Sequence, residues 1–261
     1  MIYLVPFVLL IAIGLYAIYF FSSREKRKQA LAKDVSIDPA LLEKHVLFYA
    51  ALSTEAKRRF ESGVHNFLEH TVITGIDTEV EALDRHLVAS AAIIPIFGFK
   101  GWAYQNLEEV LLYSDAINTG FETTGTSDRN ILGMVGTGSF DNKMLLSKPA
   151  LRLGFSNTSD HSNTAIHEFV HLLDKSDGDT DGIPRLLIDK QYVIPWLNLM
   201  YEMMQKAGKG GSDINAYAYT NKAEFFAVVS EYFFESPGLL SEKHPGLYAM
   251  LKKIFEVPAK P

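Results

Sequence analysis

Two histidines, His167 and His171, stand four residues apart in the stretch SNTAIHEFVHLLDKSDG. Because an α-helix has about 3.6 residues per turn, residues i and i+4 lie on one face, and two imidazoles at this spacing can reach the same metal ion. The same stretch carries an apolar stripe beside that face, which would bury the helix in a core. The stripe consists of Ile166, Phe169, Val170 and Leu173. The sequence therefore predicts a buried helix with a metal-binding face.

Glu168 follows the first histidine and lies about 100° further around the predicted helix. From there its carboxylate can reach a water on the ion without binding the ion itself. The pattern H-E-x-x-H on a helix is typical of zinc sites in which the glutamate is a general base. The chain has no cysteine, which excludes thiolate zinc fingers, cysteine nucleophiles and disulfide scaffolds. We expect one Zn²⁺, bound by His167 and His171, with Glu168 as catalytic base.

A catalytic zinc needs a third protein ligand and an open position. The metzincin pattern would require Gly at 174 and His at 177, but both positions are Asp. The acidic run from Asp177 to Gly182 resembles half of a calcium loop, yet Ile188 stands where that loop needs Glu, so a turn is expected. Glu224 and Glu231 lie seven residues apart on one face of a predicted helix, and the pattern alone divides evenly between them. The full set of candidates is Asp174, Asp177, Asp179, Asp181, Glu202, Glu224, Glu231 and His244.

The N-terminus is apolar over a length that suits a bilayer. Residues 1–23 carry no charged side chain, and the run Ile2–Phe21 as a helix would span about 30 Å. No basic residue precedes the run and no small-residue cleavage site follows it, which argues against a signal peptide. Residues 24–34 hold five basic and two acidic side chains. We expect a transmembrane anchor at 1–23, a basic juxtamembrane linker at 24–34 and a zinc peptidase domain at 35–261. By the positive-inside rule, this single-pass membrane protein would keep its catalytic domain in the cytoplasm.

The rest of the chain predicts one mixed domain of the α+β class, mostly helical with a small mixed sheet. Of the 261 residues, 48% are hydrophobic, which is enough for a real core, and the net charge of −6 argues against a nucleic-acid partner. Strands are expected at HTVITGI (70–76), Val110–Ile117 and Met144–Phe155. Pro149 would confine the last run to a sheet edge, along which an extended substrate could add as a further strand. Helices are expected to start at Pro39 and Ser53, to cover 79–94, 163–175, 190–207 and 222–235, and to follow Pro245.

The stretches HEFVHLLDKSDGDTDGIP (167–184) and AYAYTNKAEFFAVVSEYFFESP (216–237) resemble the Mlc titration factor A family. Members of this family are zinc peptidases whose catalytic core is similar to that of anthrax lethal factor. A looser likeness runs from about residue 46 to the C-terminus. The resemblance implies a zincin-like metallopeptidase domain that acts on a peptide or protein substrate and has a regulatory protein partner. It also implies the site residues: metal ligands His167, His171 and Glu224, general base Glu168, and Tyr217 beside the ion.

Two functions follow from these observations. The first is a membrane-anchored zinc metallopeptidase, in which Glu168 accepts a proton from the attacking water and Tyr217 helps to stabilise the oxyanion. The alternative is a zinc-containing binding module that sequesters a regulatory protein with weak or no hydrolysis. The complete set of ligands and base favours the peptidase, because a binding module has no need of Glu168.

Overall fold

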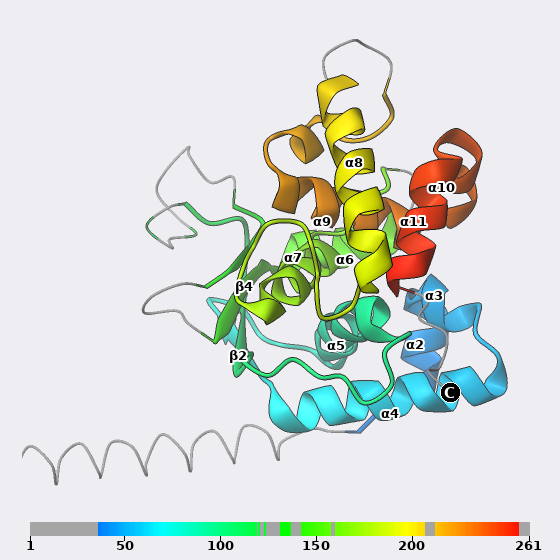
Figure 1. The fold of residues 1–261 in the computed structure, drawn as a ribbon. Helices are drawn as coiled ribbons and strands as arrows, with labels where there is room; N and C mark the ends of the chain where they lie inside the picture. The colour runs from blue at the N-terminus through cyan, green and yellow to red at the C-terminus, as the bar shows by residue number, and fades with distance from the viewer. Residues whose placement is uncertain are drawn as a thin grey trace, which may run out of the picture.

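The computed structural model describes residues 36–118, 120, 123, 131–136, 142–157, 160–206 and 212–255 (Figure 1). Three helices form its centre: α5 (Ala82–Ile96), α7 (Thr164–Asp174) and α9 (Lys222–Glu235). Helix α7 packs against both of the others. Most residues of α5 and α9 are buried, as expected for helices with neighbours on nearly every side. The motif predicted to bind metal therefore lies on the middle helix of the core.

A four-stranded sheet lies beside these helices, at the left of Figure 1. Its order is β1 (Val72–Ile76), β2 (Glu109–Tyr113), β4 (Lys143–Ser147) and β3 (Gly133–Val135). The first three strands are parallel, and β3 pairs with β4 in the antiparallel direction. Four of the five residues in β2 and in β4 are buried, which agrees with the continuous apolar runs of inner parallel strands. Strand β3 contacts α7, so this end of the sheet adjoins the motif helix.

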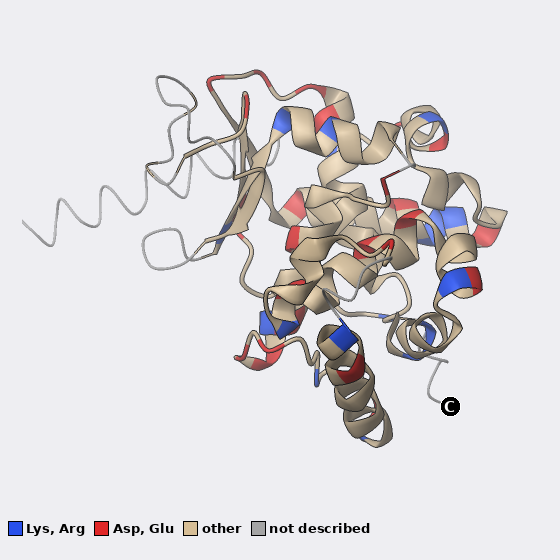
Figure 2. Ribbon diagram, turned by 90° about the horizontal axis from the view of Figure 1, so that it is seen from above, with Lys and Arg blue, Asp and Glu red and all other residues tan. Residues whose placement is uncertain are grey.

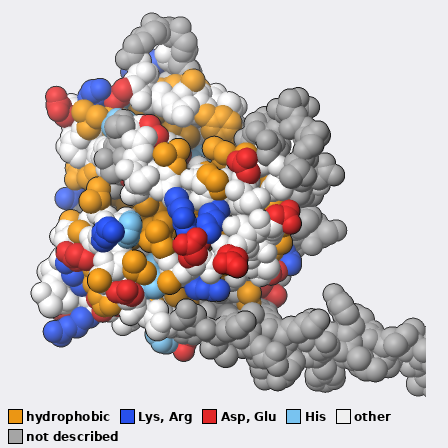
Figure 3. Space-filling view, turned by 180° about the vertical axis from the view of Figure 1, so that it is seen from behind, with side chains coloured by type: hydrophobic (Ala, Val, Ile, Leu, Met, Phe, Trp, Pro, Cys, Tyr) orange, Lys and Arg blue, Asp and Glu red, His pale blue; other side chains and the backbone are white. Residues whose placement is uncertain are grey.

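The remaining helices surround this centre. Asp38 and Ser53 accept hydrogen bonds from backbone N–H groups in the first turns of α2 and α4, as their sequences predict. Figure 2 shows the charged residues mainly on the outer elements, and Figure 3 shows acidic, basic and apolar side chains intermixed on one face. The surrounding elements are α2 (Pro39–His45), α3 (Leu47–Ala50), α4 (Thr54–His70), α6 (Lys148–Ser156), η2 (Lys175–Asp177), α8 (Lys190–Lys206), η3 (Ala216–Tyr219), α10 (Pro237–Lys243) and α11 (Pro245–Phe255).

The α+β class and most of the predicted helices are confirmed, but the predicted strand Met144–Phe155 is wrong beyond Ser147. The Ser147 hydroxyl accepts a hydrogen bond from Ala150 N, and Pro149 stands in the first turn of α6. Proline suits that position because no N–H is needed there. Strand β4 also lies between β2 and β3, so it is not the edge strand predicted to receive a substrate. Similarly, β2 ends at Tyr113, and Ile117 makes only an isolated bridge to Ile131.

The predicted transmembrane anchor (1–23) and basic linker (24–34) lie outside the described residues, so the domain start at 35 stays a prediction. Within the part of the chain that the structure describes, no helix has both the length and the apolar character needed to cross a bilayer. The longest ones, α4 and α8, have 17 residues and carry charged side chains, whereas a span needs about 20 apolar residues. The prediction of a single-pass membrane protein with a cytoplasmic domain is corrected accordingly, and the membrane is not retained as a partner.

Candidate metal centre

Helix α7 begins after Asn163, a buried residue whose side chain caps the first turn. The Asn163 side chain accepts a hydrogen bond from Ile166 N at 3.2 Å. One turn later the rings of His167 and His171 lie with their centroids 4.6 Å apart. The predicted apolar stripe is fully buried on the neighbouring face; it comprises Ile166, Phe169, Val170 and Leu173. The two imidazoles therefore share one face of a helix that the core holds in place.

Three donor atoms meet at this face. The distance from His167 Nε2 to His171 Nε2 is 3.0 Å, and that from His167 Nε2 to Glu224 Oε2 is also 3.0 Å. His171 Nε2 and Glu224 Oε2 are 3.3 Å apart. Tetrahedral ligands at about 2.0–2.1 Å from a zinc ion are separated by about 3.3 Å. The triangle thus has the size of one face of a zinc coordination tetrahedron, and its two nitrogens and one oxygen are donors that zinc accepts.

Glu224 reaches this point from the first turn of α9. The side chain of Asn221 caps α9 by accepting a hydrogen bond from Glu224 N at 3.0 Å. The capping pattern seen in the sequence is therefore real, and it positions the carboxylate as well as starting the helix. Burial raises the pKa of Glu224, but hydrogen bonds to His167 and His171 outweigh burial and hold that pKa below its usual range. The carboxylate is consequently ionised, as a metal ligand has to be.

Glu231, the rival candidate, lies on the opposite side of the His167 ring. Its Oε1 is 2.6 Å from His167 Nδ1, and its Oε2 accepts hydrogen bonds from Asn163 N at 2.6 Å and Ser162 Oγ at 3.1 Å. A carboxylate in this position keeps Nδ1 protonated and leaves Nε2 free to bind a metal. In the absence of metal, burial lowers the pKa of His167, but hydrogen bonds to Glu224 and Glu231 outweigh burial and raise it to about 10.

Glu168 is buried under the edge strand β3. A Cβ atom on Gly133 would lie 2.7 Å from Glu168 Cγ and 2.9 Å from its Oε1. Only glycine fits at 133 without moving the carboxylate. Burial raises the pKa of Glu168. This glycine and its three-residue strand were missed in the sequence, since a strand so short has no readable periodicity.

A cavity of about 610 Å³ opens onto these groups, and Tyr217 lies on its rim. Tyr217 is 52% exposed, and its ring centroid is 6.1 Å from that of His167. Burial raises the pKa of its hydroxyl, and the negative charge of the Glu224 carboxylate raises it further. Tyr219, by contrast, directs its hydroxyl to Ser212 Oγ at 3.0 Å. The other residues that line the cavity are Gly133, Met134, Val135, His167, Glu168, His171, Lys175, Thr180, Asp181, Asn221, Lys222, Ala223 and Glu224.

The other candidates have different roles. Buried Asp174 accepts a hydrogen bond from Gly182 N at 2.8 Å and so holds the turn after α7. Arg185 lies within 4.0 Å of the carboxylates of Asp177, Asp179 and Asp181, which accounts for that acidic run as a turn held by one cation. His244 contacts Asp213 at 2.7 Å, and Glu202 is exposed on α8. Among the described residues, the group suited to a metal ion is His167, His171 and Glu224.

Comparison with known proteins places these residues in a family. Residues 21–256 match the family described as glucose-regulated metallo-peptidase M90. An uncharacterized protein from Synechocystis is 26% identical over 226 residues, covering 83% of this chain and 82% of its own length. The Mlc titration factors A of Edwardsiella ictaluri and Escherichia coli (strain 55989) are 37% and 34% identical over 101 and 102 residues, covering 36% of this chain and 38% of each. The resemblance predicted from the two motifs is confirmed, although the matched region covers well under half the length of these titration factors.

Proposed function

The chain belongs to the glucose-regulated metallo-peptidase M90 family, and from this premise we propose that it is a zinc-dependent metallopeptidase with a zincin-like domain. The observation that carries the proposal is the convergence of two imidazoles and one carboxylate, with a second, buried carboxylate beside them, in one cavity. His167, His171 and Glu224 are the proposed zinc ligands. When bound, zinc supplies Lewis-acid polarisation of a carbonyl and makes water acidic enough to ionise near neutral pH.

Glu168 is the proposed general base. A buried carboxylate with a raised pKa accepts a proton readily from an activated water and can return it to a departing amine. Tyr217 is the proposed oxyanion donor, because its hydroxyl stands at the rim of the cavity beside Glu224. It is also exposed enough to meet a substrate carbonyl. Removing one such donor typically lowers turnover by about 10²–10³.

Strand β3 is the proposed docking edge for an extended peptide. Leu132 O accepts a hydrogen bond from Ser147 N, and Gly136 N donates one to Lys143 O. Since bonding alternates along an antiparallel strand, the N–H and C=O groups of Gly133 and Val135 point away from β4, on the side of the cavity that they line. A substrate strand added there would carry its backbone past Glu168. This edge replaces the one predicted at Met144–Phe155.

The test compares the wild-type protein with Glu168→Gln and Glu168→Ala on a library of unlabelled peptides, with zinc content measured for all three. We expect wild type to cleave a subset of peptides, and both variants to retain zinc and lose cleavage. A library untouched by zinc-loaded wild type would contradict the peptidase proposal. His167→Ala should lose zinc; if it keeps the metal in full, the ligand assignment is wrong.

A second candidate function is supported by the names of the titration factors, which point to a regulatory protein as partner. In that case the chain is a zinc-containing module that sequesters such a protein, and hydrolysis is weak or absent. Glu168→Gln separates the two functions. A module of this kind would retain its partner and its physiological effect in this variant, whereas a peptidase would lose its effect together with cleavage.

A further inference from the structure

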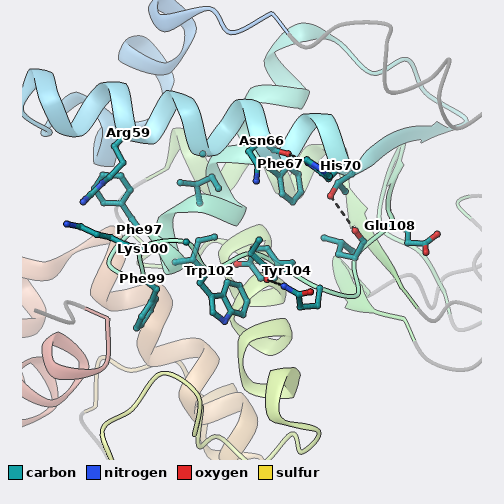
Figure 4. Close-up of a pocket in the computed structure, with 18 residues that line it drawn as sticks. Arg59, Asn66, Phe67, His70, Phe97, Phe99, Lys100, Trp102, Tyr104 and Glu108 are labelled. Carbon is teal, nitrogen blue, oxygen red and sulfur yellow. Dashed lines mark hydrogen bonds between the residues drawn. The ribbon is translucent and has the colours of Figure 1, made fainter. Parts of the chain in front are cut away.

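A second large cavity lies away from the metal centre, between α4, the end of α5 and the loop 97–108 (Figure 4). Its volume is about 660 Å³, and it has no lining residue in common with the metal cavity. This volume falls within the range of about 300–1,000 Å³ that is typical of ligand sites. We call it the aromatic pocket, after the five rings in its wall, which belong to Phe67, Phe97, Phe99, Trp102 and Tyr104.

The floor of the aromatic pocket is packed against the core. The Tyr104 hydroxyl donates a hydrogen bond to Ala92 O at 2.9 Å, which ties the loop to α5. The rings of Phe67 and Tyr104 both pack on Phe169, with centroid distances of 5.7 and 5.2 Å. Trp102 stands edge-on to Tyr104 at 4.9 Å and is only partly buried. A preformed pocket of this kind binds a large apolar group without first having to order its walls.

One end of the aromatic pocket is cationic. The Arg59 guanidinium lies 4.0 Å from the centroid of the Phe97 ring, and Figure 4 shows Lys100 at the same end of the pocket. Among the described residues, neither cation forms an ion pair with an Asp or Glu. Glu108, the acidic residue in the lining, lies at the opposite end of the pocket (Figure 4), so the charge at this end is positive. Such an arrangement favours the binding of a ligand whose apolar group has carboxylates next to it.

A third hollow of about 360 Å³ adjoins both the aromatic pocket and the metal cavity. This hollow shares Trp102 and Tyr104 with the aromatic pocket, and Val135 and Lys175 with the metal cavity. Val135 is the last residue of the edge strand β3. The three hollows thus adjoin one another from the metal centre, by way of Val135 and Trp102, to the aromatic pocket. We call this series of hollows the lined path.

We propose that the aromatic pocket binds a large apolar side chain of the substrate polypeptide, remote from the bond to be cut and flanked by acidic residues that face Arg59 and Lys100. The occupant is a polypeptide because the lined path leads to the metal centre. This identification of the occupant as the substrate rests on the proposed peptidase function. The pocket then selects substrates by a feature outside the immediate surroundings of the cleaved bond.

The test measures binding without cleavage, by fluorescence anisotropy of labelled peptides on zinc-loaded Glu168→Gln protein. The peptides have about twelve residues, enough to span roughly 40 Å when extended. They share a Gly/Ser background and differ in one cluster: Glu-Phe-Glu, Lys-Phe-Lys or Glu-Ser-Glu. We expect Glu-Phe-Glu to bind most tightly. Arg59→Glu should weaken the binding of this peptide about tenfold, because repulsion between the new glutamate and the peptide's glutamates replaces an attraction.

Arg58→Glu is the matched control, since Arg58 is an exposed neighbour on α4 outside the pocket lining and undergoes the same charge change. Lys100→Glu repeats the test on the loop, so that misfolding of one variant does not decide the outcome. Equal affinity of the Arg58→Glu and Arg59→Glu proteins for Glu-Phe-Glu would overturn the inference. The inference would also be overturned if phenylacetate bound as tightly as this peptide, because the pocket would then be a small-molecule site.

These results are independent of the peptidase test. Binding is measured on a protein that does not cut, so the absence of hydrolysis in wild type would refute the proposed function and leave the anisotropy data interpretable. Conversely, if wild type cleaves the library and the Arg58→Glu and Arg59→Glu proteins cleave it equally well, the proposed role of the aromatic pocket is refuted and the peptidase function stands. If the peptidase function and the role of the pocket are both correct, Arg59→Glu should raise KM for acidic aromatic substrates with little change in kcat.

Discussion

Replacing Glu231 by glutamine tests whether this residue orients the first histidine of the metal centre. The two carboxylate oxygens receive donors from two sides: Oε1 is 2.6 Å from His167 Nδ1, and Oε2 accepts from Asn163 N at 2.6 Å. Glutamine has the same size but only one acceptor oxygen. Its NH2 group must therefore face one of these donors, so Glu231→Gln loses one of the two hydrogen bonds without creating a cavity.

The magnitude depends on which bond is lost. If the His167 ring loses its partner, zinc affinity should fall about 10- to 100-fold, or roughly 1.4–2.7 kcal/mol. If the buried Asn163 N–H is left without an acceptor, the free energy of unfolding should fall by about 1–3 kcal/mol. We expect the sum of the two losses, measured as free energies, to be at least about 1 kcal/mol. The assays are competition with a chromophoric zinc chelator and denaturant unfolding of metal-free protein.

Glu235→Gln is the control. Glu235 stands one turn further along α9 and accepts a hydrogen bond from Asn163 Nδ2 at 3.0 Å, so it shares a partner with Glu231. The His167 ring bonds to Glu231 and Glu224 instead. Zinc affinity of this variant should stay within about twofold of wild type. A Glu231→Gln protein that binds zinc and resists denaturant like wild type would refute the orienting role.

Three further predictions follow from individual residues. Tyr217→Phe should lower kcat by about 10²–10³ while zinc content stays unchanged, and a normal kcat would remove Tyr217 from the mechanism. Gly133→Ala should lower kcat with zinc still bound, because the new Cβ would meet Glu168 Cγ at 2.7 Å, whereas Gly246→Ala, which meets nothing within 4 Å, should have no such effect. Burial raises the pKa of Asp174 from 3.8 to about 6; between these values the unfolded chain has lost the proton that the folded chain keeps, so stability falls as pH rises. Relative to Asp174→Asn, metal-free wild type should lose about 2 kcal/mol of unfolding free energy between pH 4 and pH 7, and parallel pH profiles would contradict this.

The sequence alone predicted those parts of the site that depend on a single helix. The helical spacing of His167 and His171, and the apolar stripe beside them, predicted both the helix and its two faces, since both depend on one element. The pairing of that face with Glu224 depends on how α9 crosses α7. Glu224 and Glu231 lie on the same side of α9, and tertiary packing brings one to Nε2 and the other to Nδ1 of the same ring. Local pattern cannot distinguish these outcomes.

The strand error has a different cause. The apolar run from Met144 continues smoothly into α6, and a proline inside such a run is typical of an edge strand. The order Ser147-Lys148-Pro149 is also a helix-start signal, with a capping hydroxyl followed by proline in the first turn. Both patterns were present, and the hydrogen bond to Ala150 N decides between them. Strand β3 was missed because its three residues pair with β4 through long-range contacts alone.

Asn163 shows how firmly the two helices of the metal centre are joined. Its backbone N–H donates to Glu231, its side-chain NH2 donates to Glu235, and its side-chain oxygen caps α7 at Ile166 N. This single buried residue fastens the start of the helix that carries both imidazoles to the helix that carries the third donor. The geometry of the triangle of donor atoms is thus set by contacts within the protein before any ion binds. Loss and reloading of the ion should therefore leave the backbone of both helices in register, and the centre should behave as a socket that is built in advance.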